Sequence, residues 1–255
     1  MVSSKKFKKI LILSGGISEE RDISQSSANN VYETIKNETI TKILDVTDNA
    51  DELLINIQKF SPDVIFNCLH GYFGEDGQIQ SILNYLKIPY THSGVLTSAI
   101  LMNKIISKKL FKSLGIRSPR LFDEYSFKNQ ELKFPLIIKP ISGGSSYGLI
   151  KINNNKSLSK YFNNKKVEKS KMFMEEFIYG RELTVGVLEN KICGVMEIKF
   201  SEELYDYNNK YINIAKHIIN PKLPKIIEKE LIENSLKVHS YLNCNCISRI
   251  DFRYN

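Results

Sequence analysis

The segment from residue 137 to 148, IIKPISGGSSYG, combines a lysine with glycines and serines in a pattern that suits a bound phosphate. Lys139 comes before the glycines, whereas a P-loop places its lysine after them, next to Ser or Thr. The residues that follow, YGLIKI, alternate like a strand, whereas the dinucleotide-binding fingerprint runs into a helix. The segment therefore predicts a loop between two strands, which either binds phosphate or forms an ordinary hairpin turn.

Charged residues alternate with uncharged ones along ISRIDFR, near the end of the sequence. Side chains alternate between the two faces of a strand, so Arg249, Asp251 and Arg253 should share one face. Such a charged face either lines a site or lies in solvent at the edge of a sheet. The segment by itself leaves both interpretations open.

Acidic residues follow another apolar run, in EEFIYGRELTV. Glu175 and Glu176 end the run, and Glu182 and Thr184 share a face further on. Carboxylates beside a nucleotide accept hydrogen bonds from ribose hydroxyls or from the amino group of adenine. An ordinary ladder of surface residues is the alternative.

Two further segments are polar loops. HGYFGEDG presents His70, Glu75 and Asp76 among glycines, and GGISEERD presents Glu20 at the start of a predicted helix. Taken alone, the first is a flexible polar turn. The helix dipole favours acidic residues at a helix start, so capping alone would explain the second.

Strands and helices alternate in the first third of the sequence. This order predicts an open parallel sheet, whose ligands lie beyond the carboxyl ends of its strands. The loops GGISEERDIS and HGYFGEDG both follow such ends. The predicted strands cover residues 9–13, 40–46 and 63–69, and the predicted helices cover residues 18–35, 50–60 and 79–86.

The rest of the sequence predicts an α+β arrangement. One long helix is expected over residues 96–114, and an amphipathic helix over residues 223–242. Residues 181–188 and 192–200 predict a hairpin that turns at residues 189–191. The other predicted elements are strands at residues 134–140, 147–152, 172–178 and 246–255 and a helix at residues 158–164.

Composition narrows the class of protein. The 255 residues are 42% hydrophobic, enough to bury a core, and carry a formal net charge of +8. The lysines are scattered rather than clustered, so we expect no nucleic-acid partner. No apolar run approaches the ~18 residues that span a membrane, and the early ILIL is too short for a signal peptide. We therefore expect a cytoplasmic protein without a membrane partner.

The cysteines Cys68, Cys193, Cys244 and Cys246 all lie in apolar runs and form no C-x-x-C pair. Reduced, buried thiols are therefore expected. A zinc site would require His239 beside Cys244 and Cys246, and we do not expect one.

Each of these segments also has an interpretation without a function, but the order of the segments along the sequence closely resembles that of one family. The sequence is similar over nearly its whole length to the D-alanine–D-alanine ligases, which belong to the ATP-grasp enzymes. The specific matches are HGYFGEDG, THSGV, which is similar to the family's Y-x-GSG pattern, and YDYNNKY. The other matching segments are LSGGISEERDIS, FPLIIKPISGGSSYG, EEFIYGRELTVGVL and SRIDF.

The resemblance implies an ATP-grasp fold of the α/β class, with three lobes around one cleft. Residues 1–97 would form an N-terminal Rossmann-like domain with a parallel sheet, which binds the amino acids. Residues 98–182 would form the central α+β lobe and residues 183–255 an incomplete C-terminal α+β lobe. ATP would lie between these last two lobes.

The implied reaction joins two D-alanine molecules for peptidoglycan precursor synthesis. The carboxylate of the first D-alanine attacks the γ-phosphate of ATP, and the amine of the second then displaces phosphate from the acylphosphate. The enzyme must neutralise the transferring phosphoryl group and hold both partners in line. The resemblance also implies Mg²⁺ or Mn²⁺ as cofactor and a homodimer.

On the nucleotide side, the resemblance implies a role for five residues in binding ATP. Lys104 and Lys139 match phosphate ligands, a task that suits a compact positive charge. Glu175 and Ile178 match the adenine side, and Glu182 matches the ribose ligand.

On the amino-acid side, Glu20 matches the acid that receives the first substrate's ammonium group, and His70 matches the histidine near its carboxylate. Lys210 and Tyr211 match a mobile loop that closes the site. In the family, that tyrosine links to the residues at the positions of Ser145 and Glu20.

Four further roles carry over from the family. Ser145 and Ser146 lie in the loop over the γ-phosphate, where backbone N–H groups can cradle oxygens. Arg249 matches the arginine that stabilises the tetrahedral oxyanion, which is an electrostatic role. Asp251 matches the first magnesium ligand.

The sequence also departs from the family. Gly143 and Ser142 stand where the family usually has Glu and often a basic residue, and Asn103 replaces Asp. The sequence stops at Asn255, before the family's E-x-N magnesium segment, and one carboxylate is a poor site for two bridging ions. The alternatives are therefore a non-catalytic nucleotide-binding relic or a D-alanine–D-lactate ligase, although Tyr211 favours an amine nucleophile.

Overall fold

The fold consists of two compact units that each combine helices with sheets, which confirms the predicted α/β class. Unit 1 comprises Met1–Leu101 with Asn243–Ile247, and unit 2 comprises Met102–Leu242 with Ser248–Asn255. The computed structural model describes residues 7–122, 132–145, 148–165, 168–199 and 215–255.

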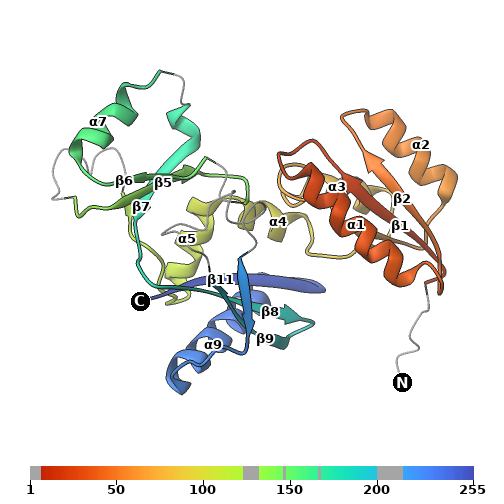
Figure 1. Ribbon diagram of the computed structural model, residues 1–255. Helices are drawn as coiled ribbons and strands as arrows, with labels where there is room; N and C mark the ends of the chain where they lie inside the picture. The colour runs from red at the N-terminus through yellow and green to blue at the C-terminus, as the bar shows by residue number, and fades with distance from the viewer. Residues whose placement is uncertain (1–6, 123–131, 146–147, 166–167, 200–214) are drawn as a thin grey trace. The chain divides into compact units, whose positions relative to one another are not determined.

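Unit 1 is built on a parallel sheet, as predicted (Figure 1). The strand order in this sheet is β2-β1-β3. Its strands are β1 (Lys9–Gly15), β2 (Ile40–Val46) and β3 (Val64–Asn67). Its helices are α1 (Arg21–Ile35), α2 (Ala50–Phe60), α3 (Gln78–Tyr85) and α4 (Val95–Met102, whose last residue belongs to unit 2).

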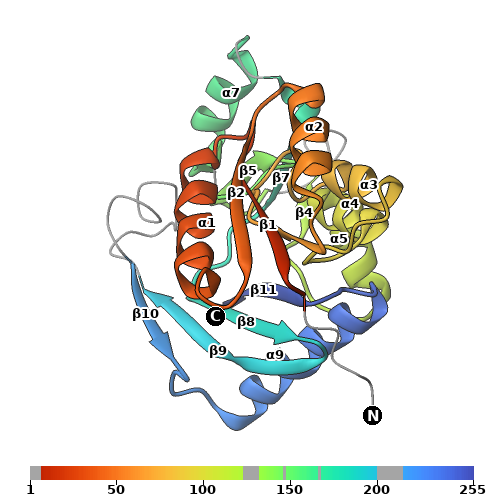
Figure 2. The same cartoon turned by 90° about the vertical axis from the view of Figure 1, so that its right-hand side faces the viewer.

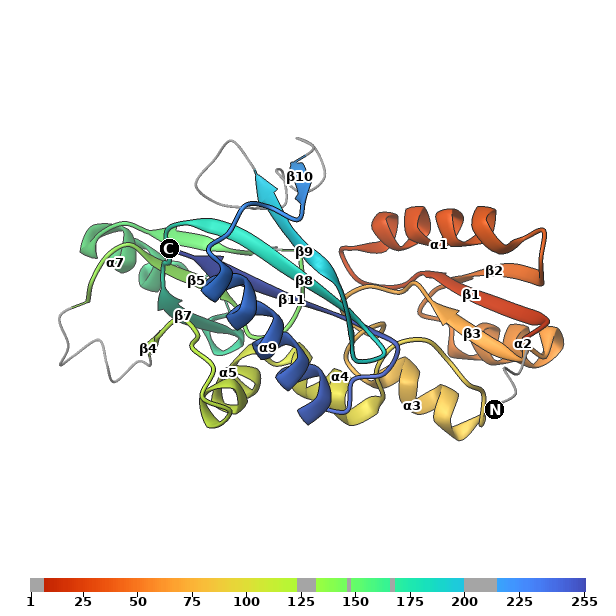
Figure 3. The same ribbon diagram turned by 90° about the horizontal axis from the view of Figure 1, so that it is seen from below.

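Strand β1 is apolar at successive positions because helices cover both faces of its sheet. Leu11 and Leu13 point to one face and pack with Leu53 of α2 and residues of α3. Ile12 points to the other face and packs with Ala28 of α1. Figure 3 shows α1 on one side of the strands and α2 and α3 on the other. Burial on both faces explains why this strand lacks the alternation of a half-exposed one.

The single long helix predicted over residues 96–114 is wrong, because two helices occupy this stretch. α4 ends at Met102, and α5 (Lys104–Ser113) begins after Asn103, whose backbone is extended. The Asn103 side chain accepts hydrogen bonds from the N–H groups of Ile105 and Ile106, both at 3.1 Å. Asparagine favours this N-cap geometry, so it starts a new helix where the apolar pattern runs on without interruption.

The first sheet of unit 2 has the order β4-β7-β5-β6, with antiparallel neighbours. β5 and β6 flank the glycine loop, so the predicted loop between two strands is confirmed. Leu136, Ile138 and Met174 of this sheet pack against Leu158 and Tyr161 of α7. The elements are β4 (Leu121–Phe122), β5 (Leu136–Pro140), β6 (Ile150–Ile152), β7 (Met172–Glu176), α7 (Asn155–Asn163) and a short 3-10 helix, η1 (Lys169–Lys171).

The second sheet of unit 2 has the order β10-β9-β8-β11 (Figure 2). The predicted hairpin is present and turns at Glu189 and Asn190, whose φ angles of 46° and 64° suit a two-residue turn. Leu231 of α9 packs on Leu183 and Val195 of the sheet. The elements are β8 (Arg181–Leu188), β9 (Lys191–Lys199), β10 (Lys216–Ile219), β11 (Ile247–Tyr254, which starts in unit 1) and α9 (Lys225–Tyr241).

The cysteines are only partly as predicted. Cys68 and Cys244 are buried, but Cys193 and Cys246 are exposed, so the expectation of four buried thiols is wrong. Cys193 alternates with half-buried neighbours on β9, which turns its side chain outward. Burial raises the pKa of the Cys68 thiol to about 11.

Within the described ranges, no helix is long and apolar enough to cross a membrane, and no group of three His, Cys, Asp or Glu could hold a metal ion.

Candidate functional site

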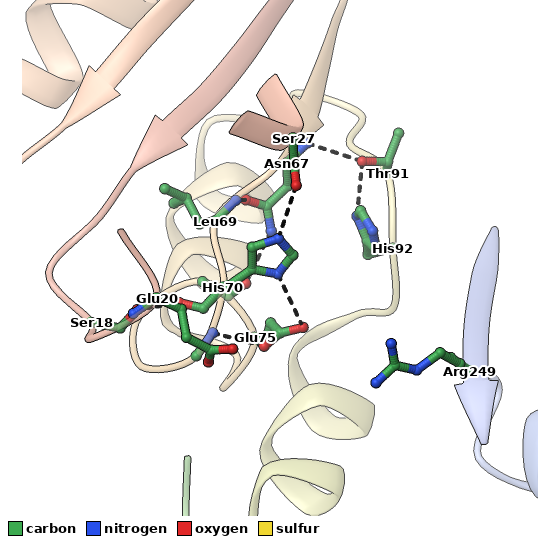
Figure 4. A network of polar contacts seen from close by, with 12 residues as sticks. Ser18, Glu20, Ser27, Asn67, Leu69, His70, Glu75, Thr91, His92 and Arg249 are labelled. Atoms are coloured by element: carbon green, nitrogen blue, oxygen red, sulfur yellow. Dashed lines mark hydrogen bonds and ion pairs between the residues drawn. The ribbon is translucent and has the colours of Figure 1, made fainter. Parts of the chain in front are cut away.

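In unit 1, the loops after β1 and β3 are tied together by direct contacts (Figure 4). The Ser18 hydroxyl donates to the His70 carbonyl oxygen at 2.7 Å. The Glu20 carboxylate lies against Gly71, where an added Cβ would come within 2.9 Å of Glu20 Oε2. Gly71 also has a φ of 66°, a conformation that favours glycine. Unit 1 therefore brings together Glu20 and His70, which were both predicted as site residues.

The His70 imidazole lies between Ser27 and Glu75 (Figure 4). Ser27 Oγ is 3.4 Å from Nε2, and Glu75 Oε1 is 4.0 Å from Nδ1. The other Glu75 oxygen accepts a hydrogen bond from the Gly71 N–H at 2.7 Å. Reduced hydration raises the pKa of Glu75, but the bonds from His70 and Gly71 outweigh this and lower it overall. The pair thus presents an imidazole beside an ionised carboxylate.

Three residues that were not predicted as site residues, Asn67, Thr91 and His92, lie beside this network. The Asn67 N–H donates to Thr91 Oγ1 at 3.0 Å, and Thr91 Oγ1 lies 3.0 Å from His92 Nδ1 (Figure 4). The buried Asn67 side chain also holds the loop, donating to Gly74 and accepting from Leu69. His92 has a φ of 78°, and it stands where the Y-x-GSG pattern has its first glycine. This replacement of glycine by histidine is the feature of the sequence that could have singled out His92. Burial lowers the pKa of His92.

In unit 2, the glycine loop is fastened at the N-terminal end of α5. The Lys104 side chain donates to the Gly143 carbonyl oxygen at 2.6 Å, and its N–H donates to Ile141 at 2.9 Å. Ser145 lies further along the loop with a φ of 49°, and Ser146 lies outside the described residues. The Lys104 ammonium group and the positive end of the α5 dipole together attract negative charge. This arrangement suits a phosphate group.

Lys139, at the carboxyl end of β5, forms an ion pair with Glu175 of β7. A second lysine, Lys108 of α5, contacts the other Glu175 oxygen at 2.6 Å. Lys108 was not predicted, although it follows Lys104 by four residues and so lies on the same face of the helix. Ile178, another predicted residue, lies half-buried just after β7. The structure thus brings together Lys139 and Glu175, which were both predicted to bind ATP, and adds Lys108 as a second partner of Glu175.

The second sheet of unit 2 carries the other predicted residues on β8 and β11. Arg249 and Asp251 form a two-point ion pair, with distances of 3.1 and 3.2 Å. Glu182 lies 3.0 Å from Arg253, which also donates to the Gly180 carbonyl oxygen at 3.1 Å. The predicted charged face of β11 is therefore present, at a sheet edge within the described residues. Lys210 and Tyr211 lie outside the described residues.

Asp251 suits a magnesium ion as one ligand among several. Its carboxylate is about half exposed and offers the hard oxygen donors that Mg²⁺ prefers. Proteins commonly hold Mg²⁺ through one or two carboxylates together with phosphate oxygens of the substrate. The described residues near Asp251 thus fit a shared, nucleotide-dependent metal better than a closed protein site.

Known families include close matches to this sequence. A family model described as D-ala D-ala ligase C-terminus matches residues 118–255, and one described as D-ala D-ala ligase N-terminus matches residues 45–93. The chain is 40% identical over 252 residues to the D-alanine–D-alanine ligase of Wolbachia pipientis wMel, covering 96% of this chain and 79% of that one. It is 42% identical over 261 residues to the ligase of Pelagibacter ubique HTCC1062, covering 97% and 84%.

Solved structures agree with these sequence relatives. The D-alanine–D-alanine ligase of Bacillus anthracis superimposes with a TM-score of 0.78 at 30% identity, covering 97% of this chain and 83% of that one. The VanG D-Ala:D-Ser ligase of Enterococcus faecalis gives a TM-score of 0.75 at 27% identity, covering 98% and 87%. The shared fold therefore extends through both units.

Proposed function

Because this chain belongs to the D-alanine–D-alanine ligase family, we propose that it joins two D-alanine molecules into D-alanyl-D-alanine at the expense of ATP. The observation that carries the proposal is the 40% identity to a ligase across 96% of the chain. The product serves peptidoglycan precursor synthesis. The reaction class agrees with the residues described above, which offer cations for phosphate and carboxylates for ammonium.

On the nucleotide side, two lysines supply the positive charge that the phosphates of ATP require. Lys104 and Lys139 neutralise the phosphates of ATP, which lowers the barrier to phosphoryl transfer. Glu175 and Ile178 bind the adenine side, and Glu182 receives the ribose hydroxyls. The contacts of Lys104 with Gly143 and of Lys139 with Glu175 support this assignment, because both lysines flank the glycine loop.

On the amino-acid side, the unit 1 cluster orients the first D-alanine. Glu20 accepts its ammonium group, and His70 lies near its carboxylate. The contacts of the His70 imidazole with Ser27 and Glu75, and the close approach of the Glu20 carboxylate to Gly71, restrict both side chains, so less entropy is lost when the substrate binds. Ser145 and Tyr211 complete this side together with Lys210.

Arg249 acts on the second step, where the amine of the second D-alanine attacks the acylphosphate. A positive charge aimed at the developing oxyanion stabilises the tetrahedral state. Bound Mg²⁺ or Mn²⁺, with Asp251 as one ligand and Ser146 near the γ-phosphate, would supply further positive charge to the phosphates. The ion pair of Arg249 with Asp251 supports this assignment, since it places the two proposed residues side by side on β11.

The proposed setting is the cytoplasm, where ATP and D-alanine are available, and the proposed assembly is a homodimer. The three lobes at residues 1–97, 98–182 and 183–255 remain our prediction for its organisation. Neither nucleic acid nor a membrane is proposed as a partner.

The test is D-alanine-dependent turnover of ATP by the 255-residue chain. We expect ADP and phosphate in equal amounts with D-alanyl-D-alanine, identified by mass spectrometry, when ATP, Mg²⁺ and D-alanine are all present. L-Alanine in place of D-alanine is the control and should give no dipeptide. ATP binding without any dipeptide would contradict the proposal and support the non-catalytic alternative.

A further inference from the structure

The carboxylate of Glu175 is buried in unit 2 and meets two lysines from different elements. Its side chain is 6% exposed. Oε1 pairs with Lys139 of β5, and Oε2 pairs with Lys108 of α5 at 2.6 Å. Each carboxylate oxygen therefore has its own cation.

The two lysines differ in how firmly they are held. The Lys108 side chain is 10% exposed and also donates to the Pro119 carbonyl oxygen at 2.8 Å. The Lys139 side chain is 26% exposed, and it stands where β5 runs into the glycine loop. Lys108 is thus fixed between two acceptors, whereas Lys139 can reach an incoming anion.

Binding of a nucleotide would change this balance. A phosphate beside the glycine loop would attract Lys139, and Glu175 would then lose one of its two cations. A buried carboxylate without any cation is strongly disfavoured. Lys108 does not depend on the glycine loop, so it would remain on Oε2 while Oε1 becomes available.

We propose that Lys108 is a positioning residue of the nucleotide site, which holds the Glu175 carboxylate in an orientation in which Oε1 accepts a hydrogen bond from the amino group of the base. The inference rests on the proposed ATP-dependent function and adds a residue that the family resemblance did not supply. It predicts that selection of a 6-amino purine over a 6-oxo purine depends on a lysine that touches no nucleotide.

The charge of Lys108 depends on the same partner. Burial lowers the pKa of Lys108, and the nearby Glu175 raises it in part. Lys139 adds a smaller repulsion, which would disappear once a phosphate draws it away. The release of Lys139 therefore strengthens the remaining pair.

The test compares Lys108→Met, which keeps the length of the side chain without its charge, with Lys109→Met. Lys109 is the exposed neighbour on α5, so it controls for the loss of one positive charge. Binding of ATP and of inosine triphosphate, which has a 6-oxo group, is measured by calorimetry. Lys108→Met should weaken ATP binding about tenfold to a hundredfold and reduce the preference for ATP over inosine triphosphate. Lys108→Arg should restore most of that preference, and Lys109→Met should change neither value.

A double variant separates positioning from packing and remains informative if Lys108→Met does not fold. In the Glu175→Gln background, adding Lys108→Met should leave the ratio of the two affinities unchanged, because Lys108 acts through Glu175. A further loss of that ratio would overturn the inference, as would an unchanged ratio in Lys108→Met itself. Failure of the unaltered chain to bind ATP would instead reject the proposed function.

Discussion

The two polar clusters hold a key carboxylate in different ways. In unit 1, Glu75 meets an imidazole and a backbone N–H in a loop that follows a parallel strand. In unit 2, Glu175 lies on a strand inside a sheet and meets two lysines. The first cluster is organised by short-range backbone contacts, and the second by long side chains from three separate elements.

This difference suits what each cluster is proposed to bind. A small amino acid needs donors and acceptors placed within a fraction of an ångström, which loop backbone and glycines such as Gly71 provide. A triphosphate carries several charges and needs cations that can move toward it, which lysines provide. The loop cluster should therefore be sensitive to shape, and the sheet cluster to charge.

The largest effect is expected from Glu175→Gln, which removes charge with little change of shape. Two lysines would then remain in a buried site without their counterion, so the free energy of unfolding should fall by about 3 kcal/mol. Urea denaturation measures this value. The control is Glu168→Gln, which breaks an exposed pair with Lys171 at 2.8 Å and should cost less than about 0.5 kcal/mol. Equal losses in both variants would show that the sheet cluster is not governed by charge.

Gly71→Ala should have the next largest effect, because it breaks the shape of the loop cluster. The new Cβ would lie 2.9 Å from Glu20 Oε2, and the alanine would have to adopt the glycine's φ of 66°. We expect a loss of stability of about 2 kcal/mol and a severalfold rise in the KM for D-alanine, with the KM for ATP unchanged. Gly115→Ala is the matched control, since its φ is 71° but its Cβ would meet nothing within 4 Å. If both variants raise the KM for D-alanine equally, contact with Glu20 is not the cause.

The smallest effect concerns His239 of α9, a histidine of unit 2 that lies outside both clusters. It is buried, and its Nδ1 lies 2.7 Å from Ser248 Oγ, while Nε2 has no hydrogen-bond partner among the described residues. Burial lowers the pKa of His239 below its value in the unfolded chain. The unfolded chain therefore takes up a proton first, so stability is full above pH ~6.5 and falls as the pH drops below it.

His239→Gln removes this titration and keeps a polar side chain. Between pH 7.5 and 5.5 the unaltered protein should lose up to about 1 kcal/mol more stability than the variant, measured by urea denaturation at each pH. The pKa of His92 is lowered in the same direction, but this residue is present in both proteins, so the difference isolates His239. Parallel pH profiles would contradict a neutral, buried His239.

Much of the fold follows directly from local patterns. Strand β2 and helix α2 have the predicted bounds, because apolar periodicity and flanking turns mark both ends. The break at Asn103 was not predicted, since the apolar pattern continues across it and only a side-chain cap separates the helices. The exposure of Cys193 was also missed, because an apolar run does not reveal which of its residues point outward.

Some contacts of the candidate site also follow from local sequence patterns, and others do not. His70 and Glu75 belong to one short motif, so the sequence by itself determined that they lie close together. It also determined that Arg249 and Asp251 share a face, because the side chains of a strand alternate. Family resemblance supplied the expected roles, and all of them remain predictions, including those of Ser146, Lys210 and Tyr211.

Only the tertiary structure decided that Lys108 and Lys139 share one carboxylate. The three groups come from α5, β5 and β7, and no local pattern relates a helix face to a particular strand position. Such contacts depend on how the sheet and helix pack, and on which charges are buried together. Local backbone preferences therefore set the elements and the closeness of His70 and Glu75, whereas long-range packing set the partners of Glu175.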